Sequence, residues 1–160
     1  MEGEIHELKI VCFRLGGETF AVDIMRVREI IKPQKLSRLP EAPAFLEGVI
    51  NLRGAIIPVL DLRKRFGMRD PLNPVDQRLL IAMIGRRPVG LAVDSVTEVV
   101  TIAVNDIRPP PEVVRFGGRR YLLGVCLVRQ RFVMLVNPDS LLDSCETDGL
   151  VEFMRGEPQI

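Results

Sequence analysis

The sequence carries one pattern of short apolar segments twice. Residues 15–31 and 84–100 share a turn glycine and the apolar residues around it at a constant offset of 69. Residues 48–61 and 124–137 share a glycine, an arginine and an apolar run at an offset of 76. Each half holds about five such segments separated by Gly and Pro, which is typical of strands and turns. Few residues are identical between the halves, so a chance match of apolar strands remains the alternative.

Five short strands make a poor open sheet, because both edges would be free to pair with other chains. Closure into a small barrel removes those edges. We therefore expect an all-β domain at residues 8–145, with one barrel subdomain at about 8–72 and a second at about 76–145. The C-terminal segment of the second range is a candidate to return to the first barrel. Residues 146–160 are expected to form an acidic tail.

Asp23 and Asn137 are candidate caps for short helices. Asp23 can open one helical turn, which then passes into a β-branched strand that ends before Pro33. Asn137 can cap a last helix over residues 138–145.

A hairpin is predicted in the middle of the first half. Its strands are expected at 49–52 and 55–60, joined by a tight Arg53-Gly54 turn. Asp61 can then cap a short helix over residues 62–66.

Composition argues against catalysis and against nucleic-acid binding. The formal net charge is +1, so no overall field attracts a polyanion. The single histidine, His6, lies in the polar N-terminal stretch, and the three cysteines show no zinc-binding spacing. No paired acid/base constellation or phosphate loop stands out. We expect no enzymatic activity, no cofactor or metal and no small-molecule substrate.

The N-terminal residues lack the basic and apolar regions of a signal peptide. Every apolar run is far shorter than the roughly 20 residues that span a bilayer. The three cysteines are odd in number and follow no regular spacing, which is typical of a reduced cytosolic chain. These features predict a cytoplasmic location without direct membrane insertion.

Several blocks of the sequence, taken in order, resemble the CheW family of bacterial chemotaxis adaptors. The match extends over about residues 8–143 and depends most on the Asn-Leu-Arg-Gly hairpin followed by a proline. The blocks are Phe20-Ala21-Val22-Asp23-Ile24, Val27-Arg28-Glu29-Ile30, Pro43-Ala44-Phe45, Gly48-Val49-Ile50-Asn51-Leu52-Arg53-Gly54, Ile57-Pro58-Val59-Leu60-Asp61-Leu62, Val89-Gly90-Leu91-Ala92-Val93-Asp94, Ile107-Arg108-Pro109 and Tyr121-Leu122-Leu123-Gly124-Val125.

The resemblance implies two intertwined, five-stranded SH3-like barrels with short helices, including one near the C-terminus. It also implies a non-catalytic scaffold that couples the cytoplasmic tip of chemoreceptors to the histidine kinase CheA, recruited to receptor arrays at the membrane. An adaptor of a twitching-motility or surface-sensing pathway is an alternative. A small barrel that binds single-stranded nucleic acid is a further one, which the low net charge and scarce aromatic residues disfavour.

Eight residues match family positions tied to receptor or kinase contact: Val27, Glu29, Gly48, Asn51, Arg53, Gly54, Val96 and Val99. Arg53 could pair with a carboxylate on a partner helix, or fold back onto Glu29 or Asp61. Alternative roles are the core for Val27, a close backbone approach for Gly48 and turn formation for Asn51.

Arginine is unusually common, with 18 residues against four lysines. A cluster in the second half is not assigned by the resemblance, and a solvated face is its default interpretation. Contact with an acidic receptor or kinase surface is the alternative. The cluster consists of Arg115, Arg119, Arg120, Arg129 and Arg131.

Overall fold

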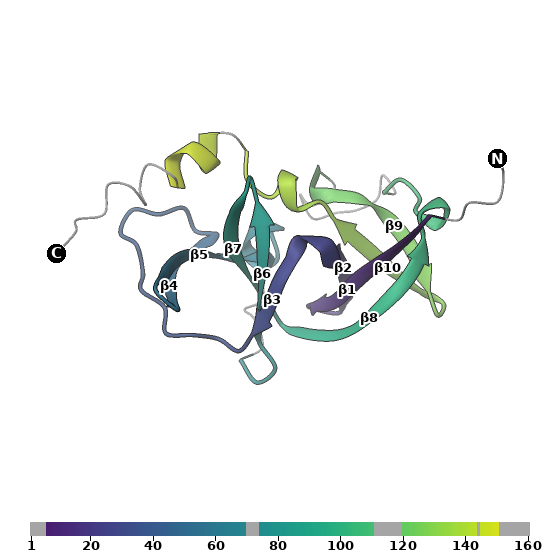
Figure 1. Cartoon of the computed structure of the whole chain (residues 1–160), viewed down its shortest axis with the longest axis horizontal. Helices are drawn as coiled ribbons and strands as arrows, with labels where there is room; N and C mark the ends of the chain where they lie inside the picture. The colour runs from purple at the N-terminus through teal and green to yellow at the C-terminus, as the bar shows by residue number, and fades with distance from the viewer. Residues whose placement is uncertain (1–5, 70–73, 111–119, 144, 151–160) are drawn as a thin grey trace.

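The computed structural model describes residues 6–69, 74–110, 120–143 and 145–150. Two five-stranded sheets, here called sheet A and sheet B, lie side by side along the long axis of the molecule (Figure 1). Sheet A has the spatial order β8 (Ser95–Ala103), β1 (Glu7–Leu15), β2 (Glu18–Asp23), β10 (Arg131–Val136) and β9 (Leu122–Val128). Sheet B has the order β3 (Val27–Ile31), β6 (Arg78–Ile84), β7 (Arg87–Val93), β5 (Ala55–Asp61) and β4 (Leu46–Leu52).

Both sheets are mixed. Strand β2 runs parallel to β10, and β5 runs parallel to β7, while all other neighbouring strands are antiparallel. The predicted all-β fold of two five-stranded units is confirmed. The ladders do not close into barrels, because among the described residues β8 is not paired with β9 and β3 is not paired with β4. Each sheet therefore keeps an open seam between its two end strands.

The two sheets are copies of one plan. Exchanging β1–β5 with β6–β10 converts the strand order of sheet A into that of sheet B. The parallel registers agree as well, since Leu135 lies opposite Ala21 in sheet A and Val59 opposite Gly90 in sheet B. These pairs are related by the offsets of 76 and 69, so the internal repeat is structural and not a chance match.

The sheets do not coincide with the two halves of the sequence. The chain crosses from sheet A to sheet B through the 3-10 turn η1 (Ile24–Arg26) and returns at Asp94, between β7 and β8. The subdomain ranges 8–72 and 76–145 therefore follow the repeat, whereas sheet B itself runs from β3 to β7. A one-residue link at Asp94 is too short for β8 to fold back beside β7, so β8 extends into the other sheet.

A buried ion pair holds the crossing at Asp94. The Arg63 Nε donates to Asp94 Oδ1 at 2.9 Å, and the Gly16 N–H donates to Asp94 Oδ2 at 2.8 Å. The Asp94 N–H donates to the Arg14 carbonyl at 3.0 Å. Both charged residues are 7% exposed. Because Arg63 follows β5 and Gly16 joins β1 to β2, this carboxylate ties one sheet to the other.

The largest hydrophobic core lies between the sheets and takes residues from both. An aromatic stack runs through it, with ring centroids 6.0 Å apart for Phe13 and Phe20, and 5.4 Å apart both for Phe20 and Phe66 and for Phe66 and Tyr121. Each sheet also encloses a smaller apolar cluster of its own. Alternation along each strand produces this arrangement, because successive side chains point to opposite faces.

Two of the predicted caps are confirmed in the first half of the chain. The Asp23 carboxylate accepts from the Met25 N–H at 2.9 Å at the start of η1. The Asp61 carboxylate accepts from the Lys64 N–H at 3.2 Å at the start of α1 (Leu62–Arg65).

The predicted C-terminal helix is displaced along the chain. Asn137 caps only the 3-10 turn η4 (Pro138–Ser140), and residues 145–150 form the helix instead. Asp143 and Glu146 exchange side-chain to backbone hydrogen bonds of 2.7 and 2.9 Å, the reciprocal pattern of a capping box. The prediction of a helix over 138–145 was wrong because this later cap was overlooked.

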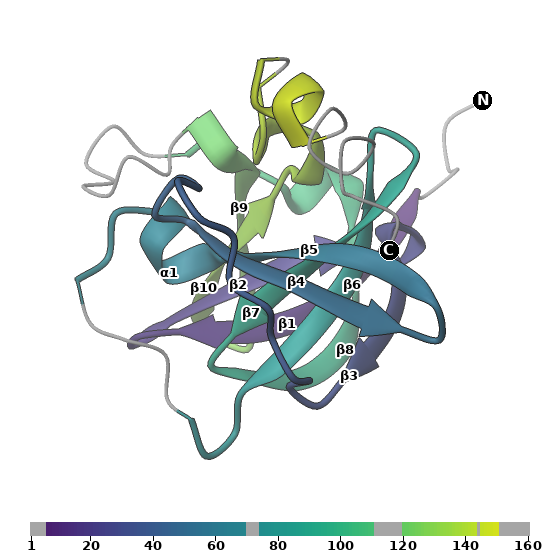
Figure 2. The same cartoon turned by 90° about the vertical axis from the view of Figure 1, so that its left-hand side faces the viewer.

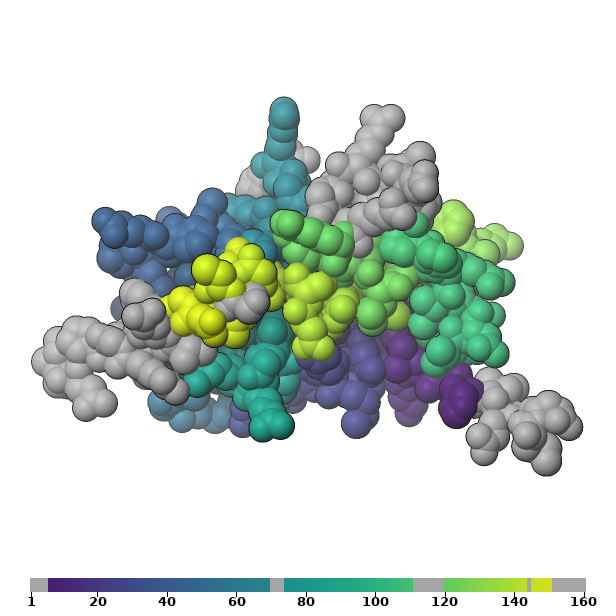
Figure 3. All heavy atoms as spheres, turned by 90° about the horizontal axis from the view of Figure 1, so that it is seen from above, coloured from purple at the N-terminus to yellow at the C-terminus, as the bar shows by residue number. Residues whose placement is uncertain are grey.

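The C-terminal helix lies beside sheet B, as the side and top views show (Figures 2 and 3). Its Glu146 carboxylate accepts from both terminal nitrogens of Arg65 of α1, at 2.6 and 2.9 Å. No helix among the described residues is long and apolar enough to cross a membrane.

Candidate functional site

The β4–β5 turn has the conformation that the sequence predicts. Arg53 and Gly54 have φ values of 51° and 87°, as a two-residue turn of this kind requires. The Asn51 side-chain oxygen accepts from the Gly54 N–H at 2.9 Å, so Asn51 shapes the turn. The Arg53 side chain projects from the tip and is 67% exposed.

An ion pair bridges the open seam of sheet B. The Arg53 guanidinium donates to the Glu29 carboxylate, which belongs to β3 on the other side of the seam. Arg53 thus folds back within its own sheet, as one of the two alternatives expected. Exposed ion pairs contribute at most about 1 kcal/mol, so a carboxylate of a partner could replace Glu29 at little cost.

An equivalent ion pair bridges the seam of sheet A. Arg129 has a φ of 49° in the β9–β10 turn and pairs with Glu98 of β8. This hydrogen bond with Glu98 raises the pKa of Arg129 above its ordinary value. Sequence reasoning placed Arg129 in an unassigned cluster and did not pair it with Glu98. The two repeat offsets contained the signal, because they relate Glu98 to Glu29 and Arg129 to Arg53.

Gly48 and Gly124 each lie against the backbone of another segment, which leaves no space for a side chain. Ser37 and Val49 exchange two backbone hydrogen bonds of 2.8 Å, and a Cβ at Gly48 would overlap the Ser37 carbonyl oxygen. A Cβ at Gly124 would lie 2.5 Å from the Arg108 carbonyl oxygen. Gly48 is buried, so its role is to dock the preceding loop onto β4.

The three valines predicted for partner contact divide into two groups. Val27 and Val96 occupy equivalent positions and pack, half-buried, against the shared core. Val99 is 51% exposed, and its repeat counterpart Ile30 is 41% exposed. Sequence reasoning missed Ile30 as a surface residue, although the offset from Val99 points to it.

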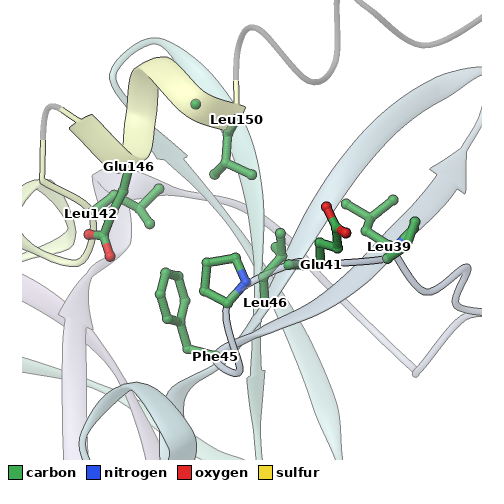
Figure 4. Close-up of a pocket in the computed structure, with 11 residues that line it drawn as sticks. Leu39, Glu41, Phe45, Leu46, Leu142, Glu146 and Leu150 are labelled. Carbon is green, nitrogen blue, oxygen red and sulfur yellow. The ribbon is translucent and has the colours of Figure 1, made fainter.

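An apolar pocket of about 240 Å³ lies away from these residues, between the loop before β4 and the C-terminal helix. Phe45 faces Leu142 and Leu150 across it (Figure 4). The Arg65 guanidinium lies 4.1 Å above the Phe45 ring while it pairs with Glu146. None of the eight predicted contact residues lines this pocket.

The described residues contain no group of three or more His, Cys, Asp or Glu side chains that could hold a metal ion. Cys12 and Cys126 are buried, and Cys145 is exposed. Burial raises the pKa of the Cys12 thiol to about 11, which keeps it protonated and unreactive near neutral pH.

Residues 9–146 match the family model of the CheW-like domain. The chain belongs to this family. It is 37% identical over 140 residues to the chemotaxis protein CheW of Rhizobium meliloti, with 88% of this chain and 90% of that protein covered. It is 32% identical over 143 residues to the protein FrzA of Myxococcus xanthus, with 86% and 87% covered.

The CheW-like fold is also found in a crystal structure of the scaffolding protein TtCheW from Thermoanaerobacter tengcongensis. The two superpose with a TM-score of 0.81 at 36% identity, covering 89% of this chain and 92% of the other. The family predicted from the sequence is confirmed.

Proposed function

We propose that this CheW-like chain is a non-catalytic scaffold that couples chemoreceptors to the histidine kinase CheA in chemotaxis. The observation that carries the proposal is its match to proteins named chemotaxis protein CheW along nearly the whole of both chains. The name of the solved relative, a scaffolding protein, supports the same role. In this role the protein works in the cytoplasm and is recruited to membrane-associated receptor arrays.

The receptor surface is assigned to the seam of sheet B. Glu29 and Arg53 present one charge of each sign there, and their pairing sets the position of both side chains. Ile30 and Ile56 are 41% and 40% exposed and offer apolar area on the same sheet. A receptor helix can bury its apolar side chains on this area, while its own charged groups exchange with the Glu29–Arg53 pair.

The kinase surface is assigned to the β9–β10 hairpin of sheet A, whose strand β9 is at the end of the sheet. Phe132 and Leu127 are 71% and 59% exposed there, beside a groove that Arg108 and Pro109 also line. Exposed large apolar side chains beside charged ones are typical of a protein interface. By the family resemblance, the regulatory domain of CheA carries the same module, so the proposed contact joins two domains of similar fold.

Signalling through such a scaffold requires no chemistry. The receptor state needs only to change the geometry of the bound kinase, and a coupling free energy of about 1–3 kcal/mol is sufficient.

The receptor surface is tested with Arg53→His. We expect a loss of receptor-dependent CheA autophosphorylation in reconstituted membranes, with an unchanged circular dichroism spectrum. The matched control is Arg86→His, because Arg86 is exposed at the β6–β7 turn of the same sheet with a φ of 67°. Normal kinase activation by the Arg53 variant would contradict the assignment.

The kinase surface is tested with Phe132→Ser and a calorimetric titration of CheA. Loss of a large buried aromatic contact should weaken binding at least about tenfold. Met25→Ser is the control, since Met25 is 83% exposed and lies on neither proposed surface. Equal CheA affinities of the two variants would show that the β9–β10 hairpin is not the kinase surface.

A further inference from the structure

The seam of sheet A forms a basic cleft of about 180 Å³. Its walls come from β1, β2, β8, β9, β10 and the β9–β10 turn, so the cleft follows the line along which the sheet stays open. The charged residues that line it are three arginines and one glutamate: Arg14, Arg129, Arg131 and Glu98.

The repeat shows which of these charges are additional. Glu98 and Arg129 correspond to the Glu29–Arg53 pair, so both seams share that frame. Two further positions differ in chemistry: Arg14 corresponds to Met83, and Arg131 to Ala55. Thr19 corresponds to Pro88 at the same offset as Arg14 to Met83. The seam of sheet A is therefore the same frame with two uncharged neighbours replaced by arginines.

The two additional arginines are available to a ligand. Arg131 is exposed and forms no ion pair with any described residue. Arg14 makes one long contact, from its Nη2 to the Gly17 carbonyl oxygen at 3.5 Å. Arg129 already pairs with Glu98, so the cleft holds one carboxylate of the chain itself, and Arg14 and Arg131 are the two arginines left for a ligand.

From this geometry we propose that the sheet A seam binds an acidic segment of a partner protein, whose carboxylates pair with Arg14 and Arg131. Arginine forks recognise carboxylates with two parallel hydrogen bonds, and arginine is enriched at protein interfaces. Val128 is half-buried and also lines the cleft, which gives the partner an apolar contact that a free anion would not use. The cleft adjoins the proposed kinase surface, because β9 and β10 contribute to both, but none of the residues named for that surface lines the cleft. The proposal gives part of the arginine cluster a role. Arg120, by contrast, lies 4.8 Å from the Tyr121 ring centroid.

The probe for this surface is an alanine-rich helical peptide with glutamates along one face, compared with the same peptide carrying glutamines. Binding is followed by amide chemical shifts in NMR spectra of the full chain. We expect the glutamate peptide to shift the signals of β1 and β10, and the glutamine peptide to leave them unchanged. The variant Arg14→Ser/Arg131→Ser should bind the glutamate peptide at least about fivefold more weakly.

The matched control is Lys35→Ser/Arg38→Ser, which removes the same charge from two exposed positions in the loop before β4. It should bind the glutamate peptide as the unaltered protein does. Equal weakening in both double variants would overturn the proposal, because it would show a response to net charge alone. Absence of glutamate-peptide binding would also overturn the proposal. So would a result in which inorganic phosphate or a single-stranded oligonucleotide shifts the β1 and β10 signals and the glutamate peptide does not.

Discussion

Replacing Asp94 with asparagine should strongly destabilise the protein. The substitution keeps the shape of the side chain but removes the charge that faces the buried Arg63 guanidinium. Breaking a buried ion pair from one side costs about 3–5 kcal/mol, because the remaining charge stays desolvated. Domains of this kind have a free energy of unfolding of about 5–15 kcal/mol, so the loss is a large share of the total.

Urea unfolding followed by far-ultraviolet circular dichroism measures this loss, since the chain has no tryptophan to report by fluorescence. Asp139→Asn is the matched control. Asp139 accepts two hydrogen bonds from Arg26, yet its side chain is 61% exposed. An exposed pair of this kind should contribute less than about 1 kcal/mol.

A double-mutant cycle with Arg63→Met separates the ion pair from other effects. Removing both charges leaves no unpaired buried ion, so the double variant should be more stable than the sum of the two single losses predicts. A loss below about 1 kcal/mol for Asp94→Asn, or strictly additive losses in the cycle, would show that the buried ion pair does not hold the crossing.

Three further predictions follow from the burial or exposure of single residues. Gly124→Ala should lower the free energy of unfolding by about 2 kcal/mol or more, as urea titration would show, because its Cβ would press on the Arg108 carbonyl oxygen. Burial raises the pKa of Asp61 in the folded protein above its ordinary value of 3.8, which the unfolded chain keeps. The free energy of unfolding should therefore fall as pH rises from the ordinary pKa through the raised one, because the unfolded chain loses this proton first. Asp61→Asn keeps a helix cap and should remove this fall in stability, which urea midpoints measured across acidic pH would reveal. Only Cys145 of the three thiols should react rapidly with a chromogenic disulfide reagent in the folded protein; a second fast thiol would contradict the described burial.

Much of the local structure follows from the sequence, because it depends on residues close together in the chain. The Asp23 and Asp61 caps act on N–H groups two and three residues away. The positive φ values at Arg53 and Gly54 are set within the turn that these residues form. The repeat offsets also relate the register of one parallel strand pair to that of the other, since both halves follow the same plan.

The tertiary structure alone decided which strands share a sheet and which charges meet. The strands of sheet A come from two distant parts of the chain because the link at Asp94 is short and the shared core lies between the sheets. The pairing of Asp94 with Arg63, and of Glu98 with Arg129, follows from that exchange. Each pair joins residues about 30 apart on different elements, and no local pattern specifies such a contact. The repeat can therefore be recognised from the sequence, whereas the basic cleft at the sheet A seam exists only in the folded chain.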